Sequence, residues 1–436
     1  MNSKISRSVI ARWLSLTVLN CRDMCLILAF FAILFPCKAQ VTQDNLDRQL
    51  TKAGCLFHSY EFDSISDTPP PAGFKPFYIS HYGRHGSRYH TQEKYFAESY
   101  ITLEKAWASG NLTVDGEHLL KQADSLYRMH DGMLGMLTAK GVREQKTLAK
   151  RMCERFPEVF AGRGMRQIES YSSDYPRCIL SLAAFTGSIL SQYPNIEVSY
   201  ESGERCSRYL RITEPYAPSK EYYYHLMHEA IEKSCDWNSV MEKLFLNPAL
   251  VEITPYEMAS HIWGAWAICE CVEDVHIDIM RYFTREQLFN TWKLRSLYYY
   301  QILAKSDRFG EAPAIGTAIL LKDFLEKADN AIVSGNTAAT LRFGHDSTLM
   351  PLMALVGIDE FDDWHTESDP IIAKWDLGSH VCMGSNFQMV FYRNRTGKIL
   401  VKILYNEKET TIPAISPFCD CYYEWDAFRT YLSQKI

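Results

Sequence analysis

The feature that most constrains this chain is the stretch at 79–88, which reads Ile-Ser-His-Tyr-Gly-Arg-His-Gly-Ser-Arg. The apolar segment 74–79 has the length and composition of a buried strand, and 95–108 has a helical pattern. Gly83 and Gly86 let the backbone turn tightly between them. Two arginines therefore flank a histidine where a strand gives way to a loop, and in open α/β sheets ligands bind at that position.

The N-terminal segment 1–39 has the pattern of a secretory signal peptide. A basic leader precedes the apolar run 25–35, which is too short to cross a bilayer comfortably. Small residues one and three positions before a cut after Ala39 complete the pattern. We therefore expect a periplasmic or secreted protein without a membrane span in its mature form. A retained anchor and a lipid-anchored Cys37 are the alternatives.

The charge of the chain argues against nucleic acid as a partner. Without residues 1–39 the chain carries 41 basic and 51 acidic residues, a net charge of −10. A protein this acidic does not bind nucleic acid through its bulk charge. An anionic small molecule would therefore need a local basic pocket.

The ten cysteines outside the leader are an even number, which in an exported chain is compatible with disulfides or with buried thiols. The two Cys-x-Cys pairs, at 269–271 and 419–421, are too closely spaced for a zinc site and lack matching histidines. We expect no metal and no cofactor.

Strand and helix patterns alternate at both ends of the chain but not in its middle. The strands are expected at 74–79, 168–172, 198–200, 331–333 and 341–346, followed by a hairpin of 387–392 and 399–405. The main helices between them are expected at 119–136, 138–156, 177–192 and 347–356.

From 203 to 305 the strand patterns disappear and only helical patterns remain, at 222–233, 239–245, 255–272 and 285–304. These patterns predict an α/β fold whose three-layer core has a mostly parallel sheet flanked by helices. An all-helical cap domain is inserted at 203–305, so the core consists of 40–202 and 306–436.

Three polar clusters each follow a strand and precede a helix. They are the segments 84–88, 172–177 and 344–346. If their strands are neighbours in a parallel sheet, the clusters meet at one edge of it. Three arginines, two histidines and an aspartate then surround one point, which suits a phosphate dianion. Each cluster alone has a plainer explanation, as a surface turn, a surface helix start or a helix cap, so the prediction depends on their conjunction.

These residue types support phosphoryl transfer without a metal. Arg84, Arg88 and Arg177 would neutralise the phosphate and hold the charge of the transition state. His85 would attack phosphorus and form a phosphohistidine, while Asp346 would protonate the departing alkoxide and then activate water. His345 would donate to a phosphoryl oxygen.

These clusters resemble the motifs of the histidine acid phosphatases. The segment 84–88 is similar to their RHGxR motif, and His345-Asp346 to their C-terminal HD motif. The helix starts at 137–141 and 173–187 and the C-terminal hairpin also match, so the resemblance extends from about 74 to 413. The segment 344–352 is closest to the branch that contains the multiple inositol polyphosphate phosphatases. The resemblance implies an α/β core with a helical cap, and hydrolysis of phosphomonoesters through a phosphohistidine.

The sequence departs from that branch at two places. Where the inositol polyphosphate phosphatases commonly have His-Ala-Glu, this chain has His345-Asp346-Ser347, which makes Asp346 the expected proton donor, as in phytases. His90 replaces a common proline, and it either lines the pocket or lies solvated in a loop. Thr91 matches a threonine that lines the phytase pocket, so the resemblance implies a substrate contact there.

We therefore expect a secreted phosphomonoesterase that acts on phytate-like inositol polyphosphates. The alternatives are a broad-specificity acid phosphatase on sugar or glycerate phosphates, a phosphohistidine mutase, which the leader disfavours, and a phosphate-binding protein without catalysis. A wider pocket for a polyanion needs further cations. A local basic cluster follows Gly203 and consists of Arg205, Arg208, Arg211 and Lys220. Its side chains either provide these cations or form only a solvated face.

Overall fold

The structure is a computed structural model that describes residues 46–161, 166–211, 220–306, 310–361 and 375–436. The expected signal peptide at 1–39 lies outside these residues. Within them, no helix combines the length and the apolar character that crossing a membrane requires.

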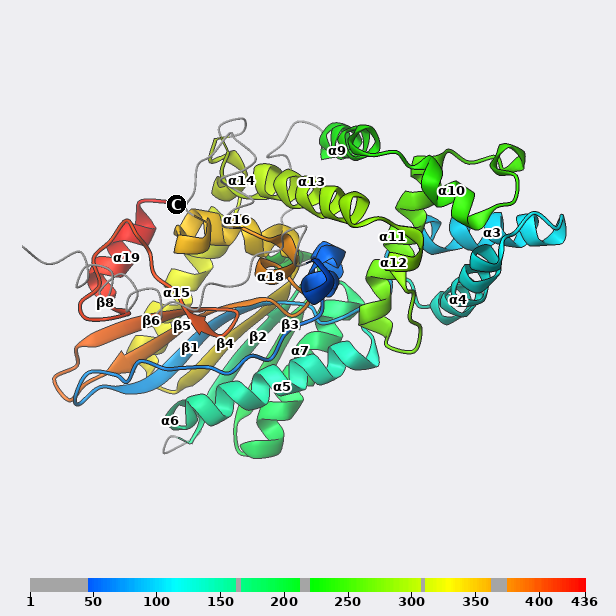
Figure 1. Cartoon of the computed structure of the whole chain (residues 1–436). Helices are drawn as coiled ribbons and strands as arrows, with labels where there is room; N and C mark the ends of the chain where they lie inside the picture. Colours follow the sequence, from blue (N-terminus) through cyan, green and yellow to red (C-terminus); the bar gives the residue numbers. More distant parts are fainter. Residues whose placement is uncertain (1–45, 162–165, 212–219, 307–309, 362–374) are drawn as a thin grey trace, which may run out of the picture. The chain divides into compact units, whose positions relative to one another are not determined.

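A mixed eight-stranded sheet lies at the centre of the fold (Figure 1). Its order is β3-β2-β4-β1-β5-β6-β7, with β8 paired to β6. The first four strands in this order are parallel, β5 is antiparallel to β1, and β6 returns to the direction of β1. The strands are β1 Lys75–Arg84, β2 Gln167–Ser172, β3 Glu197–Ser202, β4 Thr337–Gly344, β5 Asn386–Arg393, β6 Ile399–Tyr405, β7 Lys408–Glu409 and β8 Tyr422–Glu424.

Helices cover both faces of this sheet, as the α/β prediction requires (Figure 1). Because side chains alternate along a strand, Ile79 of β1 packs with α5 and α7, while Tyr78 and Tyr82 face the other helical layer. One layer contains α5 Ala139–Arg155, α6 Pro157–Phe160 and α7 Pro176–Gln192. The other contains α8 Glu204–Leu210, α15 Ala318–Ser334, α16 Asp346–Val356 and α19 Trp425–Ser433. The predicted three-layer core is confirmed.

A group of helices lies beyond one end of the sheet and extends, through α9 and α13, over the layer that contains α16 (Figure 1). Helix α11 packs on α3, α4 and α10, and α13 packs on α9, so this region uses chain segments on both sides of β2. Its helices are α3 Lys94–Ala108, α4 Val114–His130, α9 Lys220–Ser234, α10 Asn238–Leu244, α11 Pro255–Val272, α12 Ile279–Tyr282 and α13 Arg285–Leu303. The cap boundaries at 203 and 305 stay a prediction.

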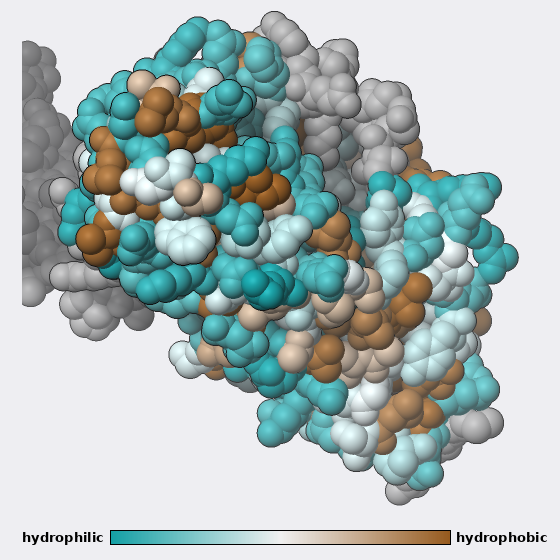
Figure 2. All heavy atoms as spheres, turned by 90° about the vertical axis from the view of Figure 1, so that its right-hand side faces the viewer, coloured by the Kyte–Doolittle hydropathy of each residue, from teal (hydrophilic) through white to brown (hydrophobic). Residues whose placement is uncertain are grey.

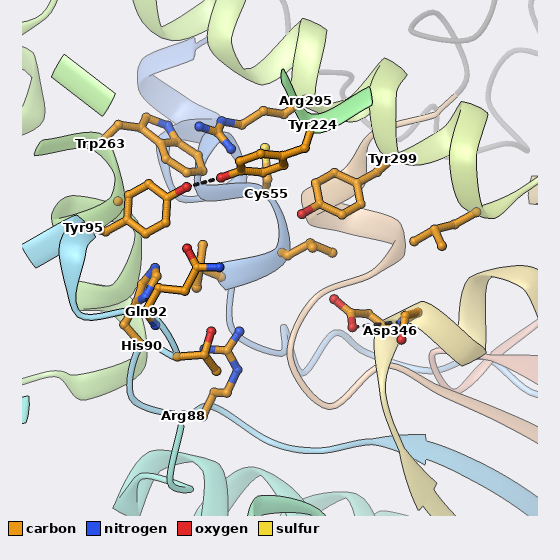
Figure 3. A pocket seen from close by; sticks show the side chains of 16 residues that line it. Cys55, Arg88, His90, Gln92, Tyr95, Tyr224, Trp263, Arg295, Tyr299 and Asp346 are labelled. Atoms are coloured by element: carbon orange, nitrogen blue, oxygen red, sulfur yellow. Dashed lines mark hydrogen bonds between the residues drawn. The ribbon is translucent and has the colours of Figure 1, made fainter. Parts of the chain in front are cut away.

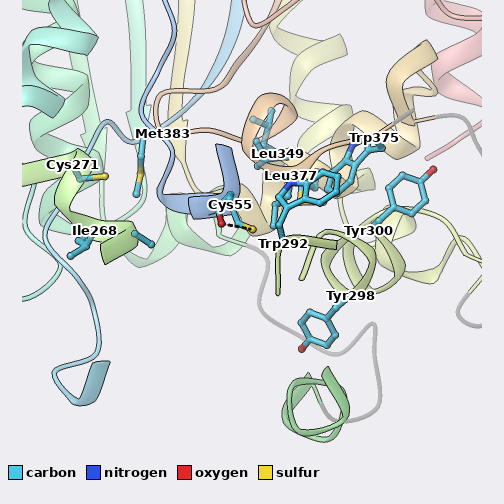
Figure 4. Packing of buried hydrophobic residues seen from close by; sticks show 14 of the residues in the cluster. Cys55, Ile268, Cys271, Trp292, Tyr298, Tyr300, Leu349, Trp375, Leu377 and Met383 are labelled. Carbon is cyan, nitrogen blue, oxygen red and sulfur yellow. Dashed lines mark hydrogen bonds between the residues drawn. The ribbon is translucent and has the colours of Figure 1, made fainter. Parts of the chain in front are cut away.

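A large apolar cluster joins these helices to the sheet layer (Figure 4). Trp292 of α13 is fully buried, and its indole N–H donates to Asp376 at 3.1 Å. Leu349 of α16 lies in the same cluster. The remaining short helices are η1 Leu46–Phe57, η2 Pro248–Leu250, α14 Ala312–Ile315, η3 Asp359–Phe361 and α18 Leu377–His380.

The outer face of the helical region carries scattered apolar side chains. Figure 2 shows apolar and hydrophilic surface interspersed there. Exposed apolar residues on these elements include Trp107, Val114 and Leu250. Isolated apolar residues are common on protein surfaces, so this face does not indicate a binding site.

One predicted strand is wrong. Residues 331–333 lie in α15, which ends at Ser334 before Gly335 in the left-handed conformation, and the strand begins at Thr337. A short apolar run does not distinguish a strand from a buried helix segment. Val333, counted as part of that run, is 88 % exposed.

The ten cysteines outside the leader were expected to form disulfides or to be buried thiols. In the structure they are free thiols, and eight of them are buried.

The backbone of the loop after β1 lies directly against the backbone at the start of α5. A Cβ on Gly141 would lie 2.1 Å from the Ser87 carbonyl oxygen, and a Cβ on Gly86 would lie 2.6 Å from that of Gly141. Thr138 caps α5 by accepting from the Gly141 N–H, and it also donates to the Ser87 carbonyl. Glycine at 141 therefore permits the contact that fixes this loop.

Gly141→Ala should lower the free energy of unfolding by about 1–3 kcal/mol, because the methyl group overpacks a backbone contact that cannot relax cheaply. Urea unfolding followed by circular dichroism measures this change. Gly187→Ala on α7 is the matched control. Its Cβ would enter open space, so the substitution should raise stability by up to about 1 kcal/mol. Equal effects of the two substitutions would contradict the packing explanation.

Candidate active site

The three polar clusters follow strands that are neighbours in the sheet. Strand β4 lies between β2 and β1. Arg84 at the end of β1 pairs with Gly344 at the end of β4, and Ser172 at the end of β2 pairs with Phe343. The strand adjacency on which the prediction depended is therefore present, and the three clusters meet at one edge of the sheet.

The Arg84 side chain is fully buried and held from several directions. Its Nη1 donates to the carbonyls of Leu56 at 3.0 Å and Val381 at 2.8 Å. Its Nη2 lies 3.3 Å from Oδ2 of Asp346. Gln145 donates to the Arg84 carbonyl. The guanidinium is thus fixed with one edge toward the carboxylate.

His85 is 2 % exposed and its ring orientation is set by its own loop. Its Nδ1 lies 2.9 Å from the Gly86 carbonyl oxygen, which can only accept, so Nδ1 carries the proton in the neutral ring and Nε2 keeps its lone pair. The Gly86 N–H donates to the Ser181 hydroxyl. Burial, followed by the charges of Arg177, Arg84 and Arg88, holds the pKa of His85 well below its usual value.

The loop behind His85 is fastened to α5. The Ser87 N–H and hydroxyl each donate to a different oxygen of the Glu144 carboxylate, both at 2.7 Å. Burial raises the pKa of Glu144, against these hydrogen bonds. Two hydrogen bonds between one residue and a buried carboxylate give the loop a single conformation.

Arg88 and Arg177 add two more cations around His85. Burial, followed by the charges of Arg177 and Arg84, lowers the pKa of Arg88 to about 10. Burial also lowers the pKa of Arg177. Mutual repulsion of like charges in a partly desolvated place makes the region a strong site for an anion.

His345 lies at the N-terminus of α16 and contacts the other clusters. Its Nε2 lies 3.1 Å from the Ser173 hydroxyl, its Nδ1 lies 3.5 Å from Nη2 of Arg177, and its ring centroid is 5.7 Å from that of His85. Burial, followed by the charge of Arg177, lowers the pKa of His345 to about 3. Both histidines are therefore neutral next to the arginines.

Asp346 begins α16, where its Oδ1 accepts from the Ser347 N–H at 2.9 Å. Its side chain is 21 % exposed, in contrast to the buried Arg84. Asp346 and Arg88 line a cavity whose far side consists of helical-region residues (Figure 3). The aspartate is therefore placed between the buried arginine and this cavity.

Two further residues of the predicted pocket also line this cavity. Thr91 is exposed on its wall. His90 is buried, stacks on Phe57 at 5.0 Å and accepts from the Gln92 N–H. Of its two alternatives, His90 is a pocket residue and not a solvated one.

The basic cluster after Gly203 is divided by the structure. Arg205 and Arg208 are exposed and pair with glutamates four residues earlier in the chain, so they form a solvated face. Arg211 is different, because its guanidinium lies 4.5 Å from the Tyr175 ring centroid and Arg177 lies at the same distance from that ring. The side chain of Lys220 lies outside the described part.

The sequence did not indicate the cap side of the cavity. This side contains an arginine and several aromatic side chains, namely Tyr95, Tyr224, Trp263, Arg295 and Tyr299. They come from α3, α9, α11 and α13. The sequence pattern that could have pointed to this wall was the high aromatic content of 203–305, and this content does not show which rings face a cavity. Among the residues that the structure describes, no group of His, Cys, Asp and Glu is suited to a metal ion.

Comparison with known proteins identifies the family. The profile of the histidine phosphatase superfamily (branch 2) matches residues 83–406. Multiple inositol polyphosphate phosphatase 1 of Gallus gallus is 26 % identical over 379 residues, covering 78 % of this chain and 78 % of that protein. The Homo sapiens protein of the same name is 23 % identical over 329 residues, covering 64 % and 62 %.

Two solved structures share the fold. The multiple inositol polyphosphate phosphatase of Bifidobacterium longum, in complex with inositol hexasulfate, has a TM-score of 0.70 at 16 % identity and covers 87 % of this chain and 97 % of its own. The phytase from D. castellii has a TM-score of 0.69 at 15 % identity, covering 92 % and 88 %. Because the family profile spans more than half of the chain, the protein belongs to branch 2 of the histidine phosphatase superfamily and is a phosphoric monoester hydrolase.

Proposed function

We propose that this enzyme is exported and hydrolyses inositol polyphosphates such as phytate through a phosphohistidine on His85. The observation that best supports this proposal is the position of His85. Its Nε2 keeps a lone pair, and the ring lies among three arginines, one of which contacts Asp346. The names of the relatives support an inositol polyphosphate as substrate. The leader pattern at 1–39 supports export.

In the first step Arg84, Arg88 and Arg177 bind the phosphate, and Nε2 of His85 attacks phosphorus. A P–N bond forms, the ester P–O bond breaks, and the leaving oxygen takes a proton from Asp346. A bound phosphate dianion favours the protonated form of His345, whose second ring N–H can then donate to a phosphoryl oxygen. In the second step water attacks phosphorus, gives a proton to Asp346, and releases inorganic phosphate as the P–N bond breaks.

Asp346 must hold a proton when the ester bond breaks. The charge of Arg84, 3.3 Å away, favours the carboxylate form. A phosphate dianion bound to the arginines adds negative charge next to Asp346, and this charge favours the protonated form. The substrate itself would therefore raise the proton affinity of its donor.

His85→Ala should reduce kcat by about a thousandfold or more on both p-nitrophenyl phosphate and phytate, because the substitution removes the proposed nucleophile. Phosphate release and nitrophenol absorbance measure the two rates. Full activity of the variant on either substrate would refute His85 as nucleophile. Activity of the wild-type enzyme on p-nitrophenyl and sugar phosphates but not on phytate would instead favour the broad-specificity alternative.

Asp346→Asn should reduce kcat on phytate by about 10²- to 10⁴-fold and have a smaller effect on p-nitrophenyl phosphate. An inositol alkoxide needs a proton to leave, whereas nitrophenolate is a stable anion. Asp131→Asn, at the exposed end of α4, is the matched control and should leave both rates unchanged. Equal losses on the two substrates would contradict the role of Asp346 as proton donor.

His85 should stay neutral as the pH falls from 8 to 5, since its pKa lies well below the usual value for histidine. Its ring C2 proton, assigned by comparison with His85→Ala, should keep a constant NMR shift over this range. In the urea-unfolded protein, the histidine rings should titrate with midpoints of about 6.5. Arg177→Gln should move the His85 midpoint upward, because the Arg177 charge is the first cause after burial. A midpoint near 6.5 in the folded wild-type protein would be the contrary result.

A further inference from the structure

One cation in the cavity has no role in the proposed bond chemistry. Arg295 of α13 lines the cavity although its side chain is only 6 % exposed. Its guanidinium carbon lies 3.9 Å from the centroid of the Trp263 ring. Its buried Nε has no hydrogen-bond partner.

Among the described residues, Arg295 also has no carboxylate as counter-ion. In the described part of the chain, no carboxylate forms an ion pair with its guanidinium. An uncompensated buried charge costs folding free energy, and stacking on an indole offsets only part of that cost. Groups that oppose folding in this way are concentrated at functional sites.

The surroundings of Arg295 are suited to an anion. Tyr95, Tyr224 and Tyr299 line the same cavity, and Figure 3 shows their rings around the space below the guanidinium. The hydroxyls of Tyr95 and Tyr224 are hydrogen-bonded to each other. Phenol hydroxyls donate readily to phosphate oxygens, and a guanidinium binds phosphate through a planar pair of N–H groups.

The cavity connects this cation with the sheet edge. Arg88 and Asp346 line its sheet side, whereas Arg295 and Trp263 belong to the helical region (Figure 3). A molecule whose phosphate occupies the site at His85 therefore extends toward α13. We infer that Arg295 binds a second phosphate group of the substrate, so that it selects organic polyphosphates over simple monoesters.

This inference depends on the proposed use of a polyphosphorylated substrate. It makes Arg295 a specificity residue, with no part in bond making or breaking. A small monoester does not reach the cap side and gains nothing from it. The competing explanation is packing, in which the Arg295–Trp263 stack only ties α13 to α11. Packing would affect every substrate alike.

Arg295→Gln separates these explanations through steady-state kinetics on two substrates. Loss of a charge-assisted contact should raise KM for phytate by about 10- to 100-fold. The kcat and KM for p-nitrophenyl phosphate should change by less than about twofold, since that ester carries one phosphate. Arg128→Gln, an exposed arginine of α4 that pairs with Asp124, removes the same charge and should change neither substrate.

Inhibition gives a readout that does not need phytate turnover. Inositol hexasulfate and inorganic sulfate are each tested as inhibitors of p-nitrophenyl phosphate hydrolysis. Arg295→Gln should raise the Ki of the hexasulfate by about 10- to 100-fold and leave that of sulfate unchanged. If the wild-type enzyme fails to cleave phytate, the proposed function fails, while the ratio of the two Ki values still decides the role of Arg295.

Arg295→Lys keeps the charge without the planar fork, so its hexasulfate Ki should lie between those of the wild-type and Gln enzymes. This variant carries the test if Arg295→Gln does not fold, as judged by its thermal midpoint. Equal fold-changes for sulfate and hexasulfate, or an unchanged hexasulfate Ki in both variants, would overturn the inference.

Discussion

The buried guanidinium of Arg84 is the interaction on which the site depends. It binds carbonyls at Leu56 and Val381 and faces Asp346, so it joins three segments that are far apart in sequence. A charge removed from water has to be paired by groups with fixed geometry. Those partners hold η1, α18 and the start of α16 around the end of β1, and the position of His85 follows from them.

The same site concentrates positive charge at the sheet edge. Arg84, Arg88 and Arg177 lie near two histidines that stay neutral. Burial, followed by the charges of the neighbouring arginines, lowers the pKa of Arg88 and of His345. Such an arrangement opposes folding and favours any bound dianion. The hydrogen bonds of Ser87 to Glu144 supply rigidity that the charges do not. In the proposed mechanism, affinity for phosphate comes from the arginine charges, and orientation comes from the hydrogen bonds that hold the loop.

Most of the site residues at this edge of the sheet could be predicted from the sequence, because a strand followed by a polar turn and a helix is a local pattern. The adjacency of 84–88 to 344–346 needed only the rule that parallel strands place their carboxyl ends together. The strand expected at 331–333 was wrong, since a short apolar run does not show that Gly335 ends a helix there. The cap wall was not predictable, because Tyr95 and Arg295 meet only through packing of distant helices.

The two sides of the cavity therefore have different tasks. Groups at the strand ends are held by the sheet and carry the bond chemistry in the proposed mechanism, while side chains from separate helices form the wall that faces them. Asp346 belongs to both, because it contacts Arg84 and also lines the cavity. In the proposed mechanism, the ester oxygen that reaches Asp346 depends on how the rest of the substrate lies against the cap. Contacts on the cap side would then determine which phosphate is removed, although none of them touches the reacting phosphorus.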